Sequence, residues 1–334
     1  MNNSLYTNCC LCPRRCGVNR DAGQLGFCGE TSELRVAFAG IHRGEEPPIS
    51  GEGGSGTVFI SGCNLGCAFC QNYQISRQNA RNSARQNARN SAAERALGRV
   101  VGTEELASIC LSLRENGAEN INIVTGSHAA PAIAAGINKA RKRGLDIPVL
   151  WNSSGYEGDE TLEILKDFVD MYLPDLKTLD SSLAARFNNA PDYPEHAAKA
   201  ILKMMESRQT MVRHLVLPGF LENTRQVLRW FAENCINSSH GSARLSLMTQ
   251  YTPVYSNRTN TGIPAGEIPA GFVSEDEYKL VLSMLDEFGI DDGFCQELVT
   301  GSEWLPDFSR PNPFSSELSN PVWHWSCLPP PSAS

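Results

Sequence analysis

Three cysteines within one short run, Cys63, Cys67 and Cys70, constrain this chain more than any other feature. Their Cys-x3-Cys-x2-Cys spacing directly follows a strand-like run at residues 57–60. Such a loop can ligate three irons of one cubane cluster and leave the fourth open to a small-molecule chelate. Electron-transfer [4Fe–4S] sites use four cysteines, and an open metal position is typical of a catalytic centre. The spacing predicts a reactive [4Fe–4S] cluster; a zinc knuckle or three neighbouring free thiols are the alternatives.

The cysteine run resembles the signature of the radical S-adenosylmethionine (SAM) superfamily, Cys-x3-Cys-x-aromatic-Cys, with Phe69 as the aromatic residue. The segment Cys70-Gln71-Asn72-Tyr73 is similar to the branch related to pyruvate formate-lyase activating enzyme. The resemblance covers residues 7–308 and is strongest to a less characterised subgroup that is similar to these activating enzymes. It implies a [4Fe–4S] cluster, bound SAM and a partial (β/α)6 barrel of the TIM type.

Chain length, net charge and cysteine usage limit the classes of protein to which this sequence can belong. A chain of 334 residues can hold one large α/β domain with appendages, or two ordinary domains. The net charge of −8 disfavours a broad nucleic-acid or anionic-membrane surface. The sequence has no apolar run of membrane-spanning length, and its polar start is unlike a signal peptide. Because most of the cysteines are clustered at metal-ligand spacing, we expect a reducing cytoplasm and metal ligation rather than disulfides or membrane association.

Three regions are predicted along the chain: a cysteine-rich knuckle and loop (1–56), the barrel (57–308) and a tail rich in Pro and Ser (309–334). The loop at residues 45–56 is expected to have little internal structure. A polar octapeptide is repeated letter for letter over residues 77–92, which predicts a mobile loop or weak surface helix inserted after the cluster loop. The tail is expected to pack over the barrel exterior or to be partly disordered.

Short apolar runs alternate with helical patterns, as in a parallel α/β sheet. The clearest helix begins at Ser274, where Ser274 and Glu277 predict a capping box. Other helices are expected behind Thr103, as an N-cap, and from Asp159 to Val169. Six βα-like units predict a partial barrel with its active site at the carboxyl ends of the strands, where Cys63 lies. Strands are predicted at residues 34–41, 57–60, 120–125, 147–152, 169–174, 211–217 and 245–250.

The resemblance places further residues near SAM. The turn that contains Asn152 and Ser154 is similar to an Asp-Thr-Asn-Gly-aromatic turn that meets SAM in the activating enzymes. The triplet Asp175-Leu176-Lys177 is similar to their Asp-Leu-Lys, which implies that Lys177 lies near the SAM carboxylate. A later strand implies that Arg213 points into the same cavity, and Phe69 is expected to lie against adenine.

Two departures from the activating enzymes stand out. Their Gly-Gly-Glu, which holds the SAM amino group, is replaced by Thr125-Gly126-Ser127-His128, so Thr125, Ser127 or His128 is expected to substitute for it. A late histidine near SAM is replaced by Gln250-Tyr251. These differences separate the chain from the activating enzymes and leave radical chemistry as the expectation.

The N-terminal knuckle supplies a second set of thiols. Four cysteines can hold a structural zinc or a second iron–sulfur cluster, and their spacing fits both. A second cluster is slightly favoured because the chain already binds one, and Cys10 is left as a spare thiol. The predicted ligands are Cys9, Cys12, Cys16 and Cys28.

We therefore expect a radical SAM enzyme that cleaves SAM reductively to a 5′-deoxyadenosyl radical for hydrogen abstraction. The expected partners are a flavodoxin- or ferredoxin-type electron donor and a glycyl radical enzyme or other protein substrate. One alternative is radical modification of a small molecule or peptide, and another is a non-catalytic iron–sulfur or metal-binding protein. The sequence does not identify the hydrogen donor.

Overall fold

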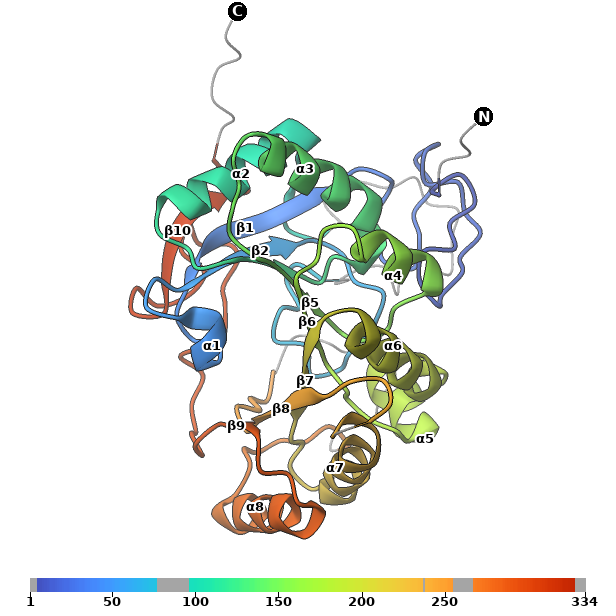
Figure 1. The fold of residues 1–334 in the computed structure, drawn as a ribbon, viewed down its shortest axis with the longest axis vertical. Coiled ribbons are helices and arrows are strands. Elements are labelled where there is room, and N and C mark those ends of the chain that lie inside the picture. The colour runs from blue at the N-terminus through green and yellow to red at the C-terminus, as the bar shows by residue number, and fades with distance from the viewer. Residues whose placement is uncertain (1–4, 77–95, 237, 255–266, 328–334) are drawn as a thin grey trace, which may run out of the picture.

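The computed structural model describes residues 5–76, 96–236, 238–254 and 267–327, and the octapeptide repeat lies outside them. A curled sheet of ten strands forms the centre of the molecule (Figure 1). The strand order is β10-β1-β2-β4-β5-β6-β7-β8-β9, with short β3 paired to β1. From β2 to β9 every neighbouring pair is parallel. The predicted α/β fold with a partial parallel barrel is confirmed.

All seven predicted strands are present, shifted by at most a few residues at their ends. Their apolar runs are buried because helices cover the outer face and the barrel interior covers the other; every residue of β2 and β4 is buried. Short strands β3 (Arg99–Val100), β9 (Gly293–Cys295) and β10 (Ser319–His324) were not predicted. The predicted seven are β1 (Arg35–His42), β2 (Ser55–Ile60), β4 (Ile121–Val124), β5 (Val149–Ser153), β6 (Met171–Pro174), β7 (Gln209–Leu215) and β8 (Ala243–Met248).

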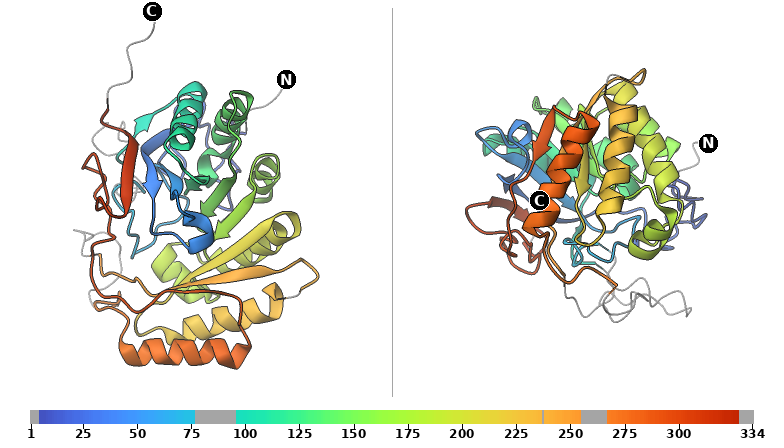
Figure 2. Two further views of the ribbon diagram at one scale, coloured as in Figure 1. Left: turned by 60° about the vertical axis from the view of Figure 1, so that its left-hand side comes forward. Right: turned by 90° about the horizontal axis from the view of Figure 1, so that it is seen from below.

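Helices lie along the outer face of the sheet (Figure 2). The capping box predicted at Ser274 is present at the start of α8. The N-cap of α2 is Gly102 rather than Thr103, and α4 ends at Leu165, four residues before Val169. The longer helices are α2 (Thr103–Glu115), α3 (Ala130–Lys142), α4 (Asp159–Leu165), α6 (Tyr193–Ser207), α7 (Leu221–Cys235) and α8 (Glu275–Phe288), and the short ones are η3 (Ser127–Ala129), α5 (Ser181–Leu183) and a π-helical turn, η4 (Ala184–Asn188).

The loop between β1 and β2 contains a short helix, α1 (Pro47–Ser50), where the sequence predicted little structure. Its residue Ile49 is 1% exposed and packs with Leu150, Leu173 and Met211 of the barrel strands. The Asn120 side chain also donates to the Ile49 carbonyl at 2.7 Å. Because β1 runs antiparallel to β2, this loop lies at the start of β2, opposite the cluster loop. Apolar contact and this hydrogen bond thus order the loop as the floor of the barrel.

The C-terminal segment is part of the sheet rather than a cover over its exterior. Strand β10 pairs antiparallel with β1 at the sheet edge, and the Trp325 indole donates to the Phe308 carbonyl at 2.8 Å. Phe314 packs against Phe59 of β2, with ring centroids 5.6 Å apart. Strands from all three predicted regions therefore join one sheet, so the boundaries at residues 56 and 308 do not separate structural units.

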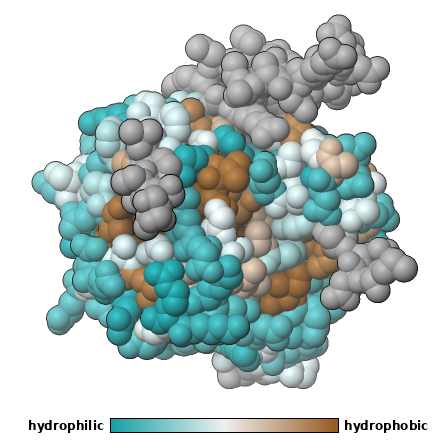
Figure 3. All heavy atoms as spheres, turned by 90° about the horizontal axis from the view of Figure 1, so that it is seen from above, coloured by the Kyte–Doolittle hydropathy of each residue, from teal (hydrophilic) through white to brown (hydrophobic). Residues whose placement is uncertain are grey.

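The surface of the molecule is largely polar in the view from above, with apolar patches between hydrophilic stretches (Figure 3). Among the described residues, none of the helices combines the length and the apolar character needed to cross a membrane.

Candidate functional site

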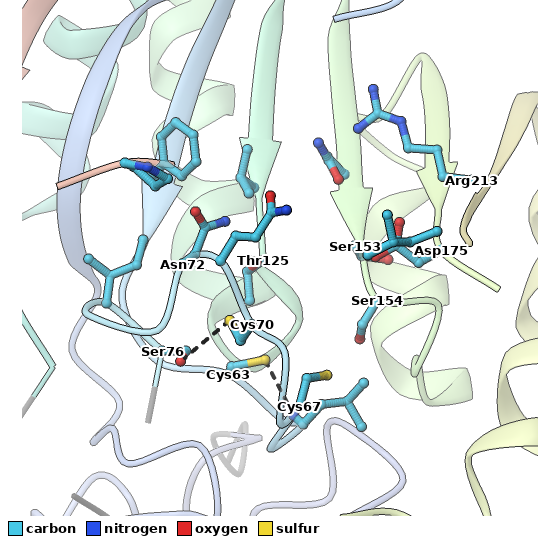
Figure 4. Close-up of a pocket in the computed structure, with 18 of the residues that line it drawn as sticks. Cys63, Cys67, Cys70, Asn72, Ser76, Thr125, Ser153, Ser154, Asp175 and Arg213 are labelled. Carbon is cyan, nitrogen blue, oxygen red and sulfur yellow. Dashed lines mark hydrogen bonds between the residues drawn. The ribbon is translucent and has the colours of Figure 1, made fainter. Parts of the chain in front are cut away.

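The cluster loop follows β2 and is fixed at its start by Gly62. This residue has φ of +89°, and a Cβ there would lie 2.6 Å from the Glu30 side chain and 2.9 Å from His128 Nε2. Its N–H donates to the Ile75 carbonyl at 2.8 Å. A glycine is therefore required for the turn that starts the loop. Beyond this turn, Cys63, Cys67 and Cys70 lie at one end of a cavity (Figure 4).

Two of the three cysteine sulfurs accept hydrogen bonds. The Leu65 N–H donates to Cys63 Sγ at 3.3 Å, and the Asn188 amide donates to Cys67 Sγ at 3.2 Å. Burial, together with the neighbouring Cys67 and Cys70, raises the pKa of the Cys63 thiol to about 12. Donors of this kind stabilise cluster-bound thiolates, and metal coordination deprotonates such a thiol outright. The two donors therefore fit cysteines that bind a cluster as thiolates.

The geometry of the thiols differs from that of a single-ion site. Among the residues that the structure describes, no three His, Cys, Asp or Glu side chains are arranged to hold one metal ion. A cubane does not need such an arrangement, because each of its cysteines binds a different iron.

The cavity has a volume of about 310 Å³, which is at the lower end of the range for small-molecule sites. It is lined by the ends of β2 and β4 to β8, as expected for a parallel barrel. The cysteines lie at one end of the cavity and Arg213 at the other (Figure 4). The structure brings together all nine residues predicted for the cluster and SAM: Cys63, Cys67, Cys70, Phe69, Asn152, Ser154, Asp175, Lys177 and Arg213.

Lys177 is held in place at the end of β6. Its Nζ donates to Asp175 Oδ2 at 2.5 Å. Burial acts to lower the Lys177 pKa, but Asp175, Cys67 and Tyr193 together outweigh this, so the pKa lies above its ordinary value and the ammonium stays charged. The hydroxyl of Tyr193, at the start of α6, accepts from the Lys177 N–H at 3.0 Å and lies 2.9 Å from the Ser154 carbonyl. Tyr193, which the sequence analysis did not single out, thus joins the ends of β5 and β6.

Arg213 is buried in the barrel against two acidic residues from the floor loop. Its Nε donates to Glu46 Oε1 at 2.9 Å and its Nη2 to Glu45 Oε2 at 2.5 Å. Burial opposes both charges, but the pairing raises the Arg213 pKa and lowers that of Glu46. Glu45 also accepts from the Asn122 amide at 3.2 Å and lines the cavity. Neither glutamate was predicted as a site residue, although the segment was noticed in the sequence.

The end of β4 occupies the position of the missing Gly-Gly-Glu. Of the three candidate replacements, all within the described residues, only Thr125 lines the cavity. The Ser127 hydroxyl donates to Glu157 at 2.7 Å, and His128 Nε2 is 2.8 Å from the Ser61 carbonyl. Thr125 has φ of +64°, which is rare for a β-branched residue and costs of order 1–3 kcal/mol. The structure therefore selects Thr125 among the three.

Phe69, which lines the cavity beside the cluster cysteines, is packed among other aromatic residues. Phe69 is buried between Phe187 and Tyr251, with both ring centroids 6.3 Å from its own.

His214 follows Arg213 in the sequence, but it is not among the described residues that line the cavity. Its Nδ1 lies 2.7 Å from the Leu176 carbonyl and its Nε2 3.0 Å from the Thr224 hydroxyl. His214 thus has a structural role.

The sequence model of the radical SAM superfamily matches residues 57–231, slightly more than half of the chain. This match covers the cluster loop and the ends of β2 and β4 to β7, which line most of the cavity. The chain belongs to the radical SAM superfamily. The cofactors implied by this family are a [4Fe–4S] cluster and SAM, and the hydrogen-bonded thiols at one end of the cavity fit the cluster. The match supports the identification of the chain as a radical SAM enzyme. It does not distinguish the activating-enzyme branch from the rest of the superfamily.

Individual relatives are distant. An uncharacterized protein of Methanocaldococcus jannaschii, MJ0674, is 28% identical over 253 residues, which cover 75% of this chain and 68% of that protein. Streptococcus suis SuiB, solved with bound S-adenosylmethionine, is 14% identical with a TM-score of 0.46. The match covers 70% of this chain, which spans about half of SuiB (48%). Escherichia coli QueE is 12% identical with a TM-score of 0.44, over 80% of this chain and 95% of QueE. These structural scores are too low to support inferences about function.

Proposed function

We propose that this radical SAM protein binds its cluster through Cys63, Cys67 and Cys70 and binds SAM in the adjoining cavity. When bound, the cluster and SAM supply a 5′-deoxyadenosyl radical that abstracts a hydrogen atom from a substrate. The observation that supports the proposal is that nine residues, predicted from separate segments of the sequence, line one cavity. A surface loop or a structural metal site does not require this convergence at the strand ends.

The proposed roles follow from the chemistry of each side chain. The Lys177 ammonium, kept charged and oriented by Asp175, would hold the SAM carboxylate. The polar groups of Asn152 and Ser154 would hold SAM hydroxyls, and Phe69 would lie against the adenine. Thr125 would face the SAM amino group from the end of β4. These groups orient SAM and limit the access of water to the reactive carbon.

We further propose that the hydrogen donor is a glycine of a partner enzyme, which becomes a glycyl radical. Support comes from the likeness of Cys70-Gln71-Asn72-Tyr73 and Asp175-Leu176-Lys177 to the activating enzymes. The chemistry also requires one external electron, for which a flavodoxin- or ferredoxin-type protein is the proposed donor. A small molecule or peptide is the alternative hydrogen donor, because the missing Gly-Gly-Glu separates this chain from the activating enzymes.

The test is anaerobic reconstitution, reduction with dithionite and chromatographic measurement of 5′-deoxyadenosine and methionine formed from SAM. We expect both products in the wild type and neither in Cys67→Ala. Wild-type protein with an intact cluster spectrum but no deoxyadenosine would contradict the proposal. With a glycine-deuterated partner enzyme, transfer of deuterium into deoxyadenosine would support glycyl radical formation, and transfer from a labelled small molecule or peptide instead would establish the alternative.

A further inference from the structure

The cysteine-rich knuckle, residues 6–30, packs directly against the cluster loop. The Cys63 N–H points at the Cys28 carbonyl, 3.4 Å away. One residue further, the Asn64 carbonyl accepts from Arg14 Nε at 2.8 Å. Cys28 is a predicted ligand of the knuckle and Cys63 is a predicted ligand of the SAM cluster. The two sets of thiols are therefore joined through their backbones.

The four knuckle thiols face a common region. A Cβ built on Gly26 would lie 3.2 Å from Cys28 Sγ and 3.9 Å from Cys16 Sγ, so both sulfurs approach this glycine. The Phe27 N–H donates to Cys16 Sγ at 3.2 Å. The Gly17 N–H, next to Cys16, donates to the Cys9 carbonyl at 3.0 Å, and the electrostatic neighbours of the Cys12 thiol include Cys28, Cys16 and Cys9. Four thiols in one region, one of them already accepting a backbone hydrogen bond, can each bind a different iron of one iron–sulfur cluster.

A buried arginine provides an independent indication of an anionic centre. The Arg20 side chain is 1% exposed. Its Nη1 lies 3.6 Å from Cys9 Sγ and donates to the His128 carbonyl at 2.7 Å. The guanidinium also donates to the Glu30 and Thr31 carbonyls, and the thiols of Cys28 and Cys9 and the Tyr6 hydroxyl are strong electrostatic neighbours of it. A buried charge needs a counter-charge, and a four-thiolate metal centre would supply it.

Building on the proposed function, we infer that Cys9, Cys12, Cys16 and Cys28 hold a second [4Fe–4S] cluster that passes electrons to the catalytic cluster. Cys16 is partly exposed, whereas Cys28 is buried against Cys63. The centre therefore faces solvent on one side and the cluster loop on the other. A flavodoxin- or ferredoxin-type protein would give one electron to the second cluster. That electron then moves to the catalytic cluster, so the donor is oxidised by one electron and the catalytic cluster is reduced by one.

The metal content is tested with the Cys63→Ala/Cys67→Ala/Cys70→Ala variant after anaerobic reconstitution. We expect about four irons per chain and a [4Fe–4S] electron paramagnetic resonance signal after reduction, since only the knuckle can then bind a cluster. The wild type should hold about twice that iron. One zinc per chain, or no metal, in the variant would overturn the inference. Because this measurement needs no SAM cleavage, its failure is distinguishable from failure of the proposed function.

Electron passage is tested by stopped-flow reduction of Cys28→Ala, with Cys10→Ala as the matched control. Reduction of the catalytic cluster by prereduced flavodoxin should be at least about tenfold slower in Cys28→Ala and unchanged in Cys10→Ala, while dithionite reduces both variants fully. Equal flavodoxin rates would overturn the relay.

If Cys28→Ala loses the catalytic cluster as well, electron passage is tested with Arg20→Gln instead. Removing this positive charge should lower the potential of the second cluster, measured by a redox titration of its resonance signal, and slow reduction by flavodoxin. An unchanged potential and an unchanged rate would overturn the inference.

Discussion

Arg213 on β7 and Glu46 on the barrel floor form an ion pair in the interior, with Arg213 Nε 2.9 Å from Glu46 Oε1. The two residues are 167 positions apart in the chain. Only 6% of Arg213 is exposed, and Glu45 provides a second carboxylate to the same guanidinium. Arg213, which was predicted to point into the cavity, therefore also holds the floor loop of the barrel through its two ion pairs.

Replacing Arg213 with methionine should therefore destabilise the fold strongly. Two buried carboxylates would lose their counter-charge, at a cost of about 3–5 kcal/mol in the free energy of unfolding. Anaerobic urea denaturation measures the change. The control is Arg225→Met, which breaks a surface pair with Glu287 and should cost about 1 kcal/mol or less. Adding Glu46→Gln to Arg213→Met should recover part of the loss; additive costs in the double variant would argue against a coupled pair.

Thr125 combines an unfavourable backbone conformation with a place in the cavity. Glycine tolerates its φ of +64°, so Thr125→Gly should relieve strain and raise the free energy of unfolding by about 1 kcal/mol or less. The same change should weaken SAM binding, because the side chain is lost. Thr125→Val keeps the strain but removes the hydroxyl, and should weaken SAM binding without the gain in stability. Denaturation and SAM titrations of both variants separate the two effects, and unaltered SAM affinity in both would exclude a role for this side chain.

Because His214 is buried, we expect the folded protein to lose stability at acid pH. Burial lowers its pKa from 6.5 to about 4 in the folded protein. The unfolded chain therefore binds more protons between these values, and the stabilisation present above pH 6.5 is lost as the pH falls toward 4. The slope for this one group is at most about 1.4 kcal/mol per pH unit. Urea denaturation of the wild type and His214→Gln across this range measures the contribution. A variant whose free energy of unfolding falls as steeply as that of the wild type would contradict the assignment.

The sheet could be predicted from sequence wherever its strands are buried on both faces. Mostly apolar runs such as Ile121–Val124, in which Asn122 is the one polar residue, are typical of strands covered on both faces. Strand β10 was not predicted because its sequence contains Pro321, which disfavours a strand except at a sheet edge, and most of its residues are exposed or only partly buried. Helix α1 was not predicted because its stability comes from the packing of Ile49 in the barrel, which no local sequence pattern indicates.

The residues of the site also fall into two groups: those that could be predicted from the sequence and those that only the structure reveals. The cluster cysteines and the strand-end residues were found because short motifs carry them in a fixed order along the chain. Tyr193, Glu45 and Glu46 act through contacts with distant segments, and these contacts are not visible in the local sequence. The choice of Thr125 over Ser127 and His128 also required the structure, because all three are polar and adjacent in sequence. Only the hydrogen bonds of Ser127 and His128 to Glu157 and Ser61 show that they face elsewhere.

Lys177 provides the most direct test of the SAM site. Its ammonium lines the cavity and is held by Asp175 at 2.5 Å. A charge-assisted hydrogen bond to the SAM carboxylate contributes about 1.5–3 kcal/mol. Lys177→Ala should therefore weaken SAM binding by about one to two orders of magnitude and leave the iron content unchanged. Production of deoxyadenosine should fall with it at subsaturating SAM.

The measurement is a titration of the reduced cluster's electron paramagnetic resonance signal with SAM. Lys199→Ala is the matched control, because Lys199 pairs with Asp159 on the exposed surface and should not affect SAM affinity. Removing Lys177 also leaves Asp175 without its cation, so part of any loss could come from the exposed carboxylate. Lys177→Ala/Asp175→Asn removes that charge: if affinity stays low in the double variant, the ammonium itself binds SAM, and if affinity returns to the wild-type value, Lys177 serves only to neutralise Asp175.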